Sequence, residues 1–117
     1  MHAVAETSIF TRRADALLSR DDRTVLISTL ATDPEAGDLV PGLGGIRKLR
    51  FAPAGRGKSG AFRVIYYLAG VNVPVLALLI YAKNEQDNIS AEQRHALLAI
   101  INAYKAERRA KKKGTAE

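Results

Sequence analysis

Three β-prone runs follow one another between residues 46 and 83: IRKLRF at 46–51, AFRVIYYL at 61–68 and VPVLALLIYAK at 73–83. Each run contains several β-branched or aromatic residues, and the links between the runs contain glycine, which is typical of turns. Adjacent strands with short links pair most simply as an antiparallel meander. The rest of the predicted fold is built around this sheet.

Two helices are predicted before the sheet, at residues 12–19 and 21–32, and together they form a helical hairpin. Asp21 and Asp22 are placed to cap the second of them. Residues 7–11 favour extended backbone and predict a short first strand ahead of the hairpin.

A final helix is predicted after the sheet. It begins at Ser90, and Gln93 stands three residues later, where it completes a capping box. Leu97, Ile101 and Tyr104 recur at helical spacing and predict the stripe that this helix buries.

Alternation along the strands divides their side chains between two faces. One face is apolar and is expected to pack against the helices: Leu49, Phe51, Phe62, Val64, Tyr66 and Leu68. The other face carries Lys48, Arg50 and Arg63, and Lys83 at the end of the third strand can lean over the sheet edge. Arg47 falls outside this alternation and would need a bulge to join the cluster. The sequence therefore predicts an α+β fold, with an antiparallel sheet, two N-terminal helices and a C-terminal helix packed on one face, and an open basic face on the other.

Length and composition limit the possible classes of protein. The chain has 117 residues, of which 47% are hydrophobic and 26% charged, and this suits a single globular domain. We expect the domain to cover residues 1–110 and a flexible basic tail to follow at 111–117. Residues 1–13 lack the apolar stretch of a signal peptide, and the longest apolar run, at 73–82, is about half as long as a membrane helix needs. The absence of cysteine excludes disulfides and thiolate zinc sites, so a cytoplasmic protein without membrane association is expected.

Charge is distributed unevenly along the chain. The net charge is +6, and no acidic residue occurs between residues 39 and 84. That stretch carries seven cations: Arg47, Lys48, Arg50, Arg56, Lys58, Arg63 and Lys83. A buried sheet would exclude charges of both signs, whereas only the acids are missing here. The pattern favours a surface that binds a polyanion, and it leaves a divalent metal without carboxylate ligands on that surface.

A surface of lysine and arginine can promote the cleavage of RNA without a metal ion or another cofactor. The ribose 2′-hydroxyl is an internal nucleophile, so the protein needs only to position it and to stabilise the charge that develops on the phosphate. DNA lacks this hydroxyl and would not be cut. Tyr67, on the predicted open face, suits either a core position or a base-stacking platform.

In three motifs the chain resembles the RelE/HigB group of bacterial type II toxins, within the RelE/ParE superfamily. The motifs are GGIRKLRF at 44–51, GKSGAFRVIYY at 57–67 and YAKNE at 81–85, and the resemblance covers roughly residues 37–104. It implies a RelE-like fold and an mRNA interferase that works without a metal ion in the ribosomal A site, beside the 16S rRNA. It also implies a cognate antitoxin, HigA-like and with a helix-turn-helix domain.

The resemblance further implies roles for individual residues. Arg63 matches an arginine that contacts the scissile phosphate, and Lys48 and Lys83 become the candidate base and acid. Asn84 replaces the arginine of a Lys-Arg pair, and Ser90 lies near the place of a tyrosine that stacks on the substrate base. Catalytic roles are therefore expected for Arg63, Lys48 and Lys83, and RNA contacts for Arg47, Arg50, Arg56, Lys58, Tyr67, Tyr81 and Asn84.

Two other functions stay open on the sequence alone. A ParE-like toxin of the same superfamily would inhibit DNA gyrase and cut nothing. A non-catalytic basic interaction domain would account for the charge but not for the motifs. The basic open face favours the nuclease, because an inhibitor of gyrase does not need a catalytic cluster of cations.

Overall fold

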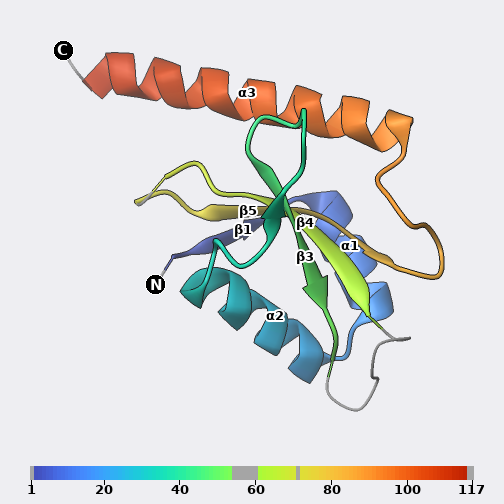
Figure 1. Cartoon of the computed structure of the whole chain (residues 1–117). Coiled ribbons are helices and arrows are strands. Elements are labelled where there is room, and N and C mark those ends of the chain that lie inside the picture. Colours follow the sequence, from blue (N-terminus) through green and yellow to red (C-terminus); the bar gives the residue numbers. More distant parts are fainter. Residues whose placement is uncertain (1, 54–60, 71, 116–117) are drawn as a thin grey trace.

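The computed structural model describes residues 2–53, 61–70 and 72–115, and within them three helices surround a five-stranded sheet (Figure 1). The fold is α+β, as predicted. Its elements follow the chain in this order: β1 (Val4–Glu6), α1 (Ser8–Leu17), α2 (Arg20–Thr32), β2 (Asp38–Leu39), β3 (Ile46–Phe51), β4 (Phe62–Tyr67), β5 (Val75–Ala82) and α3 (Ala91–Thr115).

The sheet has the strand order β1-β5-β4-β3-β2. Strands β3, β4 and β5 form the predicted antiparallel meander, and β2 adds to it in the same sense. The edge strand β1 is parallel to β5, so the sheet is mixed rather than wholly antiparallel. This arrangement follows from the position of β1 ahead of the helical hairpin, because a strand that reaches the sheet edge through a helical crossover can run parallel to its neighbour.

The prediction of a strand at residues 7–11 is wrong. Strand β1 ends at Glu6, and Thr7 is the N-cap of α1, where its side chain accepts a hydrogen bond from the backbone N–H of Phe10. Threonine favours both strands and helix N-caps, and the capping role prevails here. The predicted cap of α2 is also displaced: Ser19 accepts from the N–H of Asp22, while the two predicted acids lie in the first turn.

The helices α1 and α2 cover one face of the sheet. Their buried side chains meet the predicted apolar face of β3 and β4 and the matching positions of β5. This first core consists of Phe10, Ala14, Leu18, Leu26, Leu30, Phe51, Phe62, Val64, Tyr66, Val75, Ala77 and Ile80. The alternation of side chains along β3 and β4 thus correctly predicted which of them face the helical hairpin.

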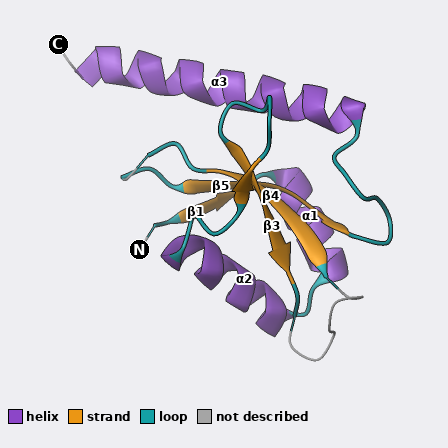
Figure 2. Cartoon of the chain, in the orientation of Figure 1, coloured by secondary structure: helices purple, strands orange, loops and turns teal. Residues whose placement is uncertain are grey.

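Helix α3 packs on the opposite face, so the prediction of all three helices on one side is wrong (Figure 2). The capping box that opens α3 is confirmed, because Gln93 N–H donates to Ser90 Oγ at 3.1 Å and Ser90 N–H donates to Gln93 Oε1 at 3.0 Å. The buried side chains beneath α3 form a second core: Leu43, Ile46, Ile65, Tyr67, Leu78, Leu79, Tyr81, Leu97 and Ile101. This apolar area would face water if α3 lay elsewhere.

Strand β5 contains an irregularity that determines which side chains share a face. Ile65 of β4 pairs with Leu79, whereas the next residue, Tyr66, pairs with Ala77. Leu78 therefore has no partner on β4 and acts as the extra residue of a β-bulge.

The extra residue reverses the alternation of β5. Before it, Val75 and Ala77 face the helical hairpin; after it, Ile80 does. Tyr81 accordingly lies on the face of α3. Lys83 stands two residues after Tyr81, one residue past the end of β5, at the next position of that same face. Without the bulge, strand alternation would direct Lys83 to the side of α1.

Helix α3 continues to Thr115, into the range for which the sequence analysis expects a flexible tail, and that expectation stays a prediction. Within the described part of the chain, no helix is both long enough and apolar enough to span a membrane.

Candidate functional site

Two arginines of the predicted site lie side by side on the sheet. Arg50 of β3 is directly opposite Arg63 of β4, and Arg63 is directly opposite Tyr81 of β5. Residues paired in this way project from the same face, with their Cβ atoms about 5 Å apart. The three side chains therefore form a row across the sheet, on the α3 side and at the end farthest from Ile46 and Tyr67, which α3 covers.

Lys48 belongs to the adjacent row, where it is opposite Ile65. Arg50 is exposed, whereas Lys48 and Arg63 are half-buried, so the cations lie at the margin of the second core. Among the described residues, none of Lys48, Arg50, Arg63 and Lys83 forms an ion pair with an acid. Asp38 of β2 is opposite Lys48 but forms no ion pair with it, so the cluster keeps a concentration of positive charge that suits a phosphate-rich ligand.

Arg47 lies apart from this cluster. The register of β3 against β4 is regular from Ile46 to Phe51, so the bulge that Arg47 would need is not there. Its side chain projects to the other face, where its guanidinium donates to the carbonyl of Gly37 at 2.7 Å. Arg47 therefore stays outside the cluster, and its contact with RNA stays a prediction. Its role here is to hold the segment before β2, since backbone carbonyls there take its hydrogen bonds.

The sequence predicts Tyr67 on an open face, and this prediction is wrong. It is only 7% exposed, because α3 covers it. The ring of Tyr104 meets it edge-on at 6.1 Å between centroids, and Lys105 Nζ lies 5.6 Å from its centroid. Burial raises the pKa of Tyr67 above its ordinary value, and Tyr104 adds to the rise. A nucleobase cannot stack on this ring while α3 is in place.

Tyr81 is fully buried, and its hydroxyl has no hydrogen-bond partner among the described residues. Burial raises the pKa of this hydroxyl, and the positive charge of Arg63 opposes the rise. The structure therefore does not offer Tyr81 as a stacking surface either. It lies at the end of the arginine row as an uncharged neighbour of Arg63.

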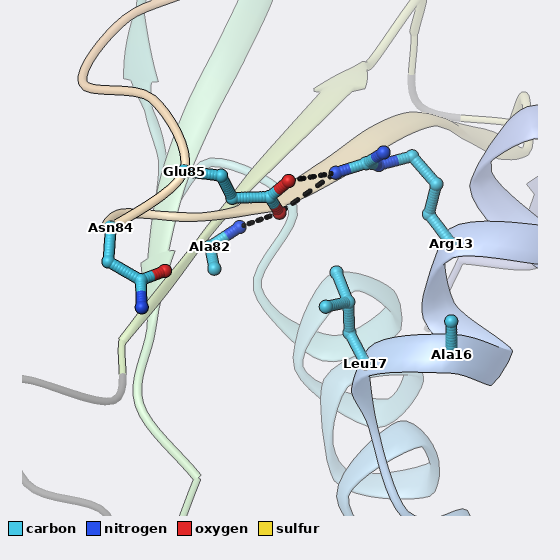
Figure 3. Close-up of a pocket in the computed structure, with 6 residues that line it drawn as sticks. All are labelled: Arg13, Ala16, Leu17, Ala82, Asn84 and Glu85. Carbon is cyan, nitrogen blue, oxygen red and sulfur yellow. Dashed lines mark hydrogen bonds and ion pairs between the residues drawn. The ribbon is translucent and has the colours of Figure 1, made fainter.

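Lys83 and Asn84 occupy an exposed turn after β5. The turn is closed by the N–H of Glu85, which donates to the carbonyl of Ala82 at 3.1 Å. A shallow open pocket of about 270 Å³ lies between this turn and α1 (Figure 3). It is lined by Arg13, Ala16, Leu17, Ala82, Asn84 and Glu85.

Arg13 and Glu85 hold this turn, and the sequence analysis missed both. Their side chains point toward each other across the pocket in Figure 3, and the guanidinium donates to both carboxylate oxygens, at 2.9 and 3.0 Å. One signal in the sequence marks Glu85, which is the first acid after the acid-free stretch. Arg13 had no comparable signal, because an arginine on a helix surface is usually solvated.

The remaining predicted contacts are Arg56 and Lys58, which lie outside the described residues. In the part of the chain that the structure describes, no group of three histidine, cysteine, aspartate or glutamate side chains is arranged to hold a metal ion.

The chain matches the model of a known protein family. The family model described as RelE toxin of RelE / RelB toxin-antitoxin system matches residues 7–114, which spans α1 to α3 and includes the arginine row and the turn after β5. The three helices and the mixed five-stranded sheet of the described residues are consistent with the fold of that family.

Proposed function

The chain belongs to the RelE toxin family, and we propose that it is a ribosome-dependent endoribonuclease that cleaves mRNA without a metal ion. It is a RelE-type toxin of a toxin–antitoxin system, and its family implies an antitoxin partner. Members of this family are typically endoribonucleases, which places RNA cleavage ahead of other activities.

The observation that carries the proposal is the pairing of Arg50 with Arg63, with Lys48 in the next row, on strands β3 to β5, which contain no acid. Like charges directly opposite each other destabilise a sheet, so this arrangement needs a compensating anion. An RNA phosphate between the two guanidinium groups would supply it, because arginine binds phosphate oxygens through parallel hydrogen bonds.

In the proposed reaction, the ribose 2′-oxygen attacks the adjacent phosphorus and the 5′-oxygen of the next nucleotide leaves. Arg63 stabilises the negative charge that grows on the phosphate oxygens. Lys48 and Lys83 are the candidates for taking the proton from the 2′-hydroxyl and for giving one to the leaving oxygen. Arg50 and Asn84 hold the RNA on either side. The ribosome supplies the substrate in the A site, where the 16S rRNA offers further phosphates to this basic protein.

The antitoxin is proposed to be HigA-like, with a helix-turn-helix domain and a segment that is acidic or amphipathic. Such a segment would either cover the cation cluster or displace α3 from the second core. Covering the cluster is supported by its charge, since four cations without acidic partners attract an acidic chain.

The rival function is a ParE-like inhibitor of DNA gyrase. The two activities differ in their first effect on the cell, because mRNA cleavage stops translation whereas gyrase poisoning induces a response to DNA damage. Both can be followed within minutes of induced expression.

The deciding experiment is induced expression of the wild type, Arg63→Ala and Arg12→Ala, with primer extension on a cellular mRNA. Arg12 is an exposed arginine of α1, so its variant controls for the loss of one positive charge. We expect cuts inside translated codons in the wild type and in Arg12→Ala, and none in Arg63→Ala. Growth arrest without cuts would favour the gyrase inhibitor, and an absence of arrest would favour a non-catalytic interaction domain.

A further inference from the structure

The edge of β5 beyond the short strand β1 is completed by side chains. Strand β1 pairs only with residues Val75 to Ala77, so the later backbone groups of that edge lack a neighbouring strand. Thr7 Oγ1 donates to the carbonyl of Leu78 at 3.0 Å, and Arg13 Nε donates to the carbonyl of Ile80 at 2.6 Å. Since an unpaired backbone group near the core is costly, these contacts stabilise the second half of β5.

The same edge continues into the turn that carries Lys83 and Asn84. The backbone N–H of Ala82 donates to Glu85 Oε1 at 2.7 Å, and Arg13 Nη2 donates to both oxygens of that carboxylate. Arg13 therefore contacts the strand through one nitrogen and the turn through another. The two side chains fasten the turn to β5 and to α1 at once (Figure 3).

The other backbone hydrogen bonds of the turn are longer. The N–H of Lys83 lies 3.3 Å from the carbonyl of Ala61, and the N–H of Gln86 lies 3.4 Å from that of Ala82. The lysine itself is exposed and has four rotatable bonds in its side chain. Its place relative to Arg63 thus depends on how firmly its backbone is held.

We propose that Arg13 and Glu85 are positioning residues for Lys83, and that they act by fixing the turn from which Lys83 reaches the RNA phosphate held at Arg63. This inference rests on the proposed function, and it assigns two residues, one of them on α1, that do not touch the substrate. A surface ion pair of this exposure, 34% for Arg13 and 40% for Glu85, contributes little to stability. Its effect should therefore be larger in catalysis than in folding.

The chain offers a matched control in Arg23. Its guanidinium pairs with Glu6 at 2.5 Å and also with Asp15, so it joins α2 to β1 and α1. Among the described residues its partners are Glu6 and Asp15, which lie outside the turn after β5. Arg23→Ala and Arg13→Ala both remove an arginine that joins two or more elements through its hydrogen bonds. Only Arg13→Ala removes a contact with the turn that carries Lys83.

The test is a double-mutant cycle between Arg13 and Lys83, measured as single-turnover cleavage of mRNA on programmed ribosomes. A misplaced catalytic group costs about 10- to 100-fold, so we expect Arg13→Ala to lower kcat by at least about tenfold with little change in KM. Added to Lys83→Ala, the same change should have no further effect, because there is no lysine left to position. Glu85→Gln, which keeps an oxygen for the N–H of Ala82, should lose less activity than Glu85→Ala.

Two results would overturn the inference: a multiplicative loss in the double variant, or an equal loss of kcat in Arg23→Ala. A second measurement covers the case in which the wild type does not cleave RNA and the proposed function itself fails. Amide hydrogen exchange then reports the turn directly, and the N–H of Ala82 should exchange faster in Arg13→Ala than in the wild type or Arg23→Ala. Unchanged exchange at Ala82 would also overturn the inference.

Discussion

Arg50 and Arg63 are directly opposite each other on neighbouring antiparallel strands, and no acid in the described part of the chain is paired to either. Cross-strand pairs are the unit of sheet stabilisation, and like charges in that position are destabilising. A neutral residue at either position would make the folded sheet more stable than the arginine pair does. A cost of this kind at one place on a surface is typical of a binding site, where the ligand provides the missing charge.

Neutralising one member of the pair should stabilise the free protein. We expect Arg50→Gln to raise the free energy of unfolding by about 0.2–1 kcal/mol at low ionic strength. The gain should shrink in about 1 M salt, because salt screens exposed charges. Urea unfolding at both salt concentrations measures this. Arg12→Gln, at an exposed arginine of α1, is the control, and an equal gain there would show that net charge alone is responsible.

The two buried hydroxyls of Tyr66 and Tyr81 make a contrasting pair. Tyr66 OH accepts a hydrogen bond from the N–H of Gly37 at 2.8 Å, whereas Tyr81 OH has no partner among the described residues. We expect Tyr66→Phe to destabilise the fold by about 1 kcal/mol and Tyr81→Phe to be neutral or stabilising. Denaturant unfolding of the two variants measures the change in the free energy of unfolding that each causes. A comparable loss in both would mean that Tyr81 OH has a bound water in solution.

Glu85 should make the stability of the fold sensitive to acid. The hydrogen bond from the N–H of Ala82, and then the neighbouring Arg13, lower the pKa of Glu85 below its ordinary value of 4.5. Since the pKa is lower in the folded chain than in the unfolded chain, the stabilisation is complete above the unfolded pKa and is lost as pH falls through the folded pKa. Below pH 4.5 the Tm of the wild type should therefore fall more steeply than that of Glu85→Gln. Parallel curves from thermal melts across this range would contradict the assignment.

Association with the antitoxin should depend on salt. If an acidic segment covers the cation cluster, electrostatic steering speeds the encounter, and screening removes this effect. We expect the association rate to fall at least about tenfold between low and high ionic strength. Stopped-flow mixing measures it, with Arg50→Gln expected to reduce the slope. A rate that stays the same at all salt concentrations would instead favour an apolar segment that takes the place of α3.

The local elements were predictable where residue pattern alone determines them. The bounds of β3 follow from the alternation of Leu49 and Phe51 with cations, and the start of α3 follows from the capping box of Ser90 and Gln93. The arginine row was predictable in part, because Arg50 and Arg63 belong to strands that were correctly identified. Thr7 was misassigned because its residue type suits two local structures.

The side of the sheet on which α3 lies was not predictable from its stripe. A helix with a stripe at Leu97 and Ile101 can pack on either face, and the choice depends on which face carries a matching apolar area. Ile65 and Tyr67 provide that area beside the cations, whereas alternation along β4 considered alone predicts an open surface at Tyr67. The partnership of Arg13 with Glu85 was hidden for a similar reason, since it joins residues 72 positions apart.

The extra residue at Leu78 has a consequence for how this chain tolerates changes in length. Strand alternation has only two phases, and a single insertion or deletion exchanges them for everything downstream. Leu78 is the exception, because its removal would abolish the bulge and leave Tyr81 and Lys83 on the side of α3. Losing one residue from the regular part of β5, with the bulge kept, would instead transfer side chains to the opposite side of the sheet. The lineage of this toxin is thus expected to tolerate many substitutions in β5, and changes of one residue at the bulge rather than in the regular parts of the strand.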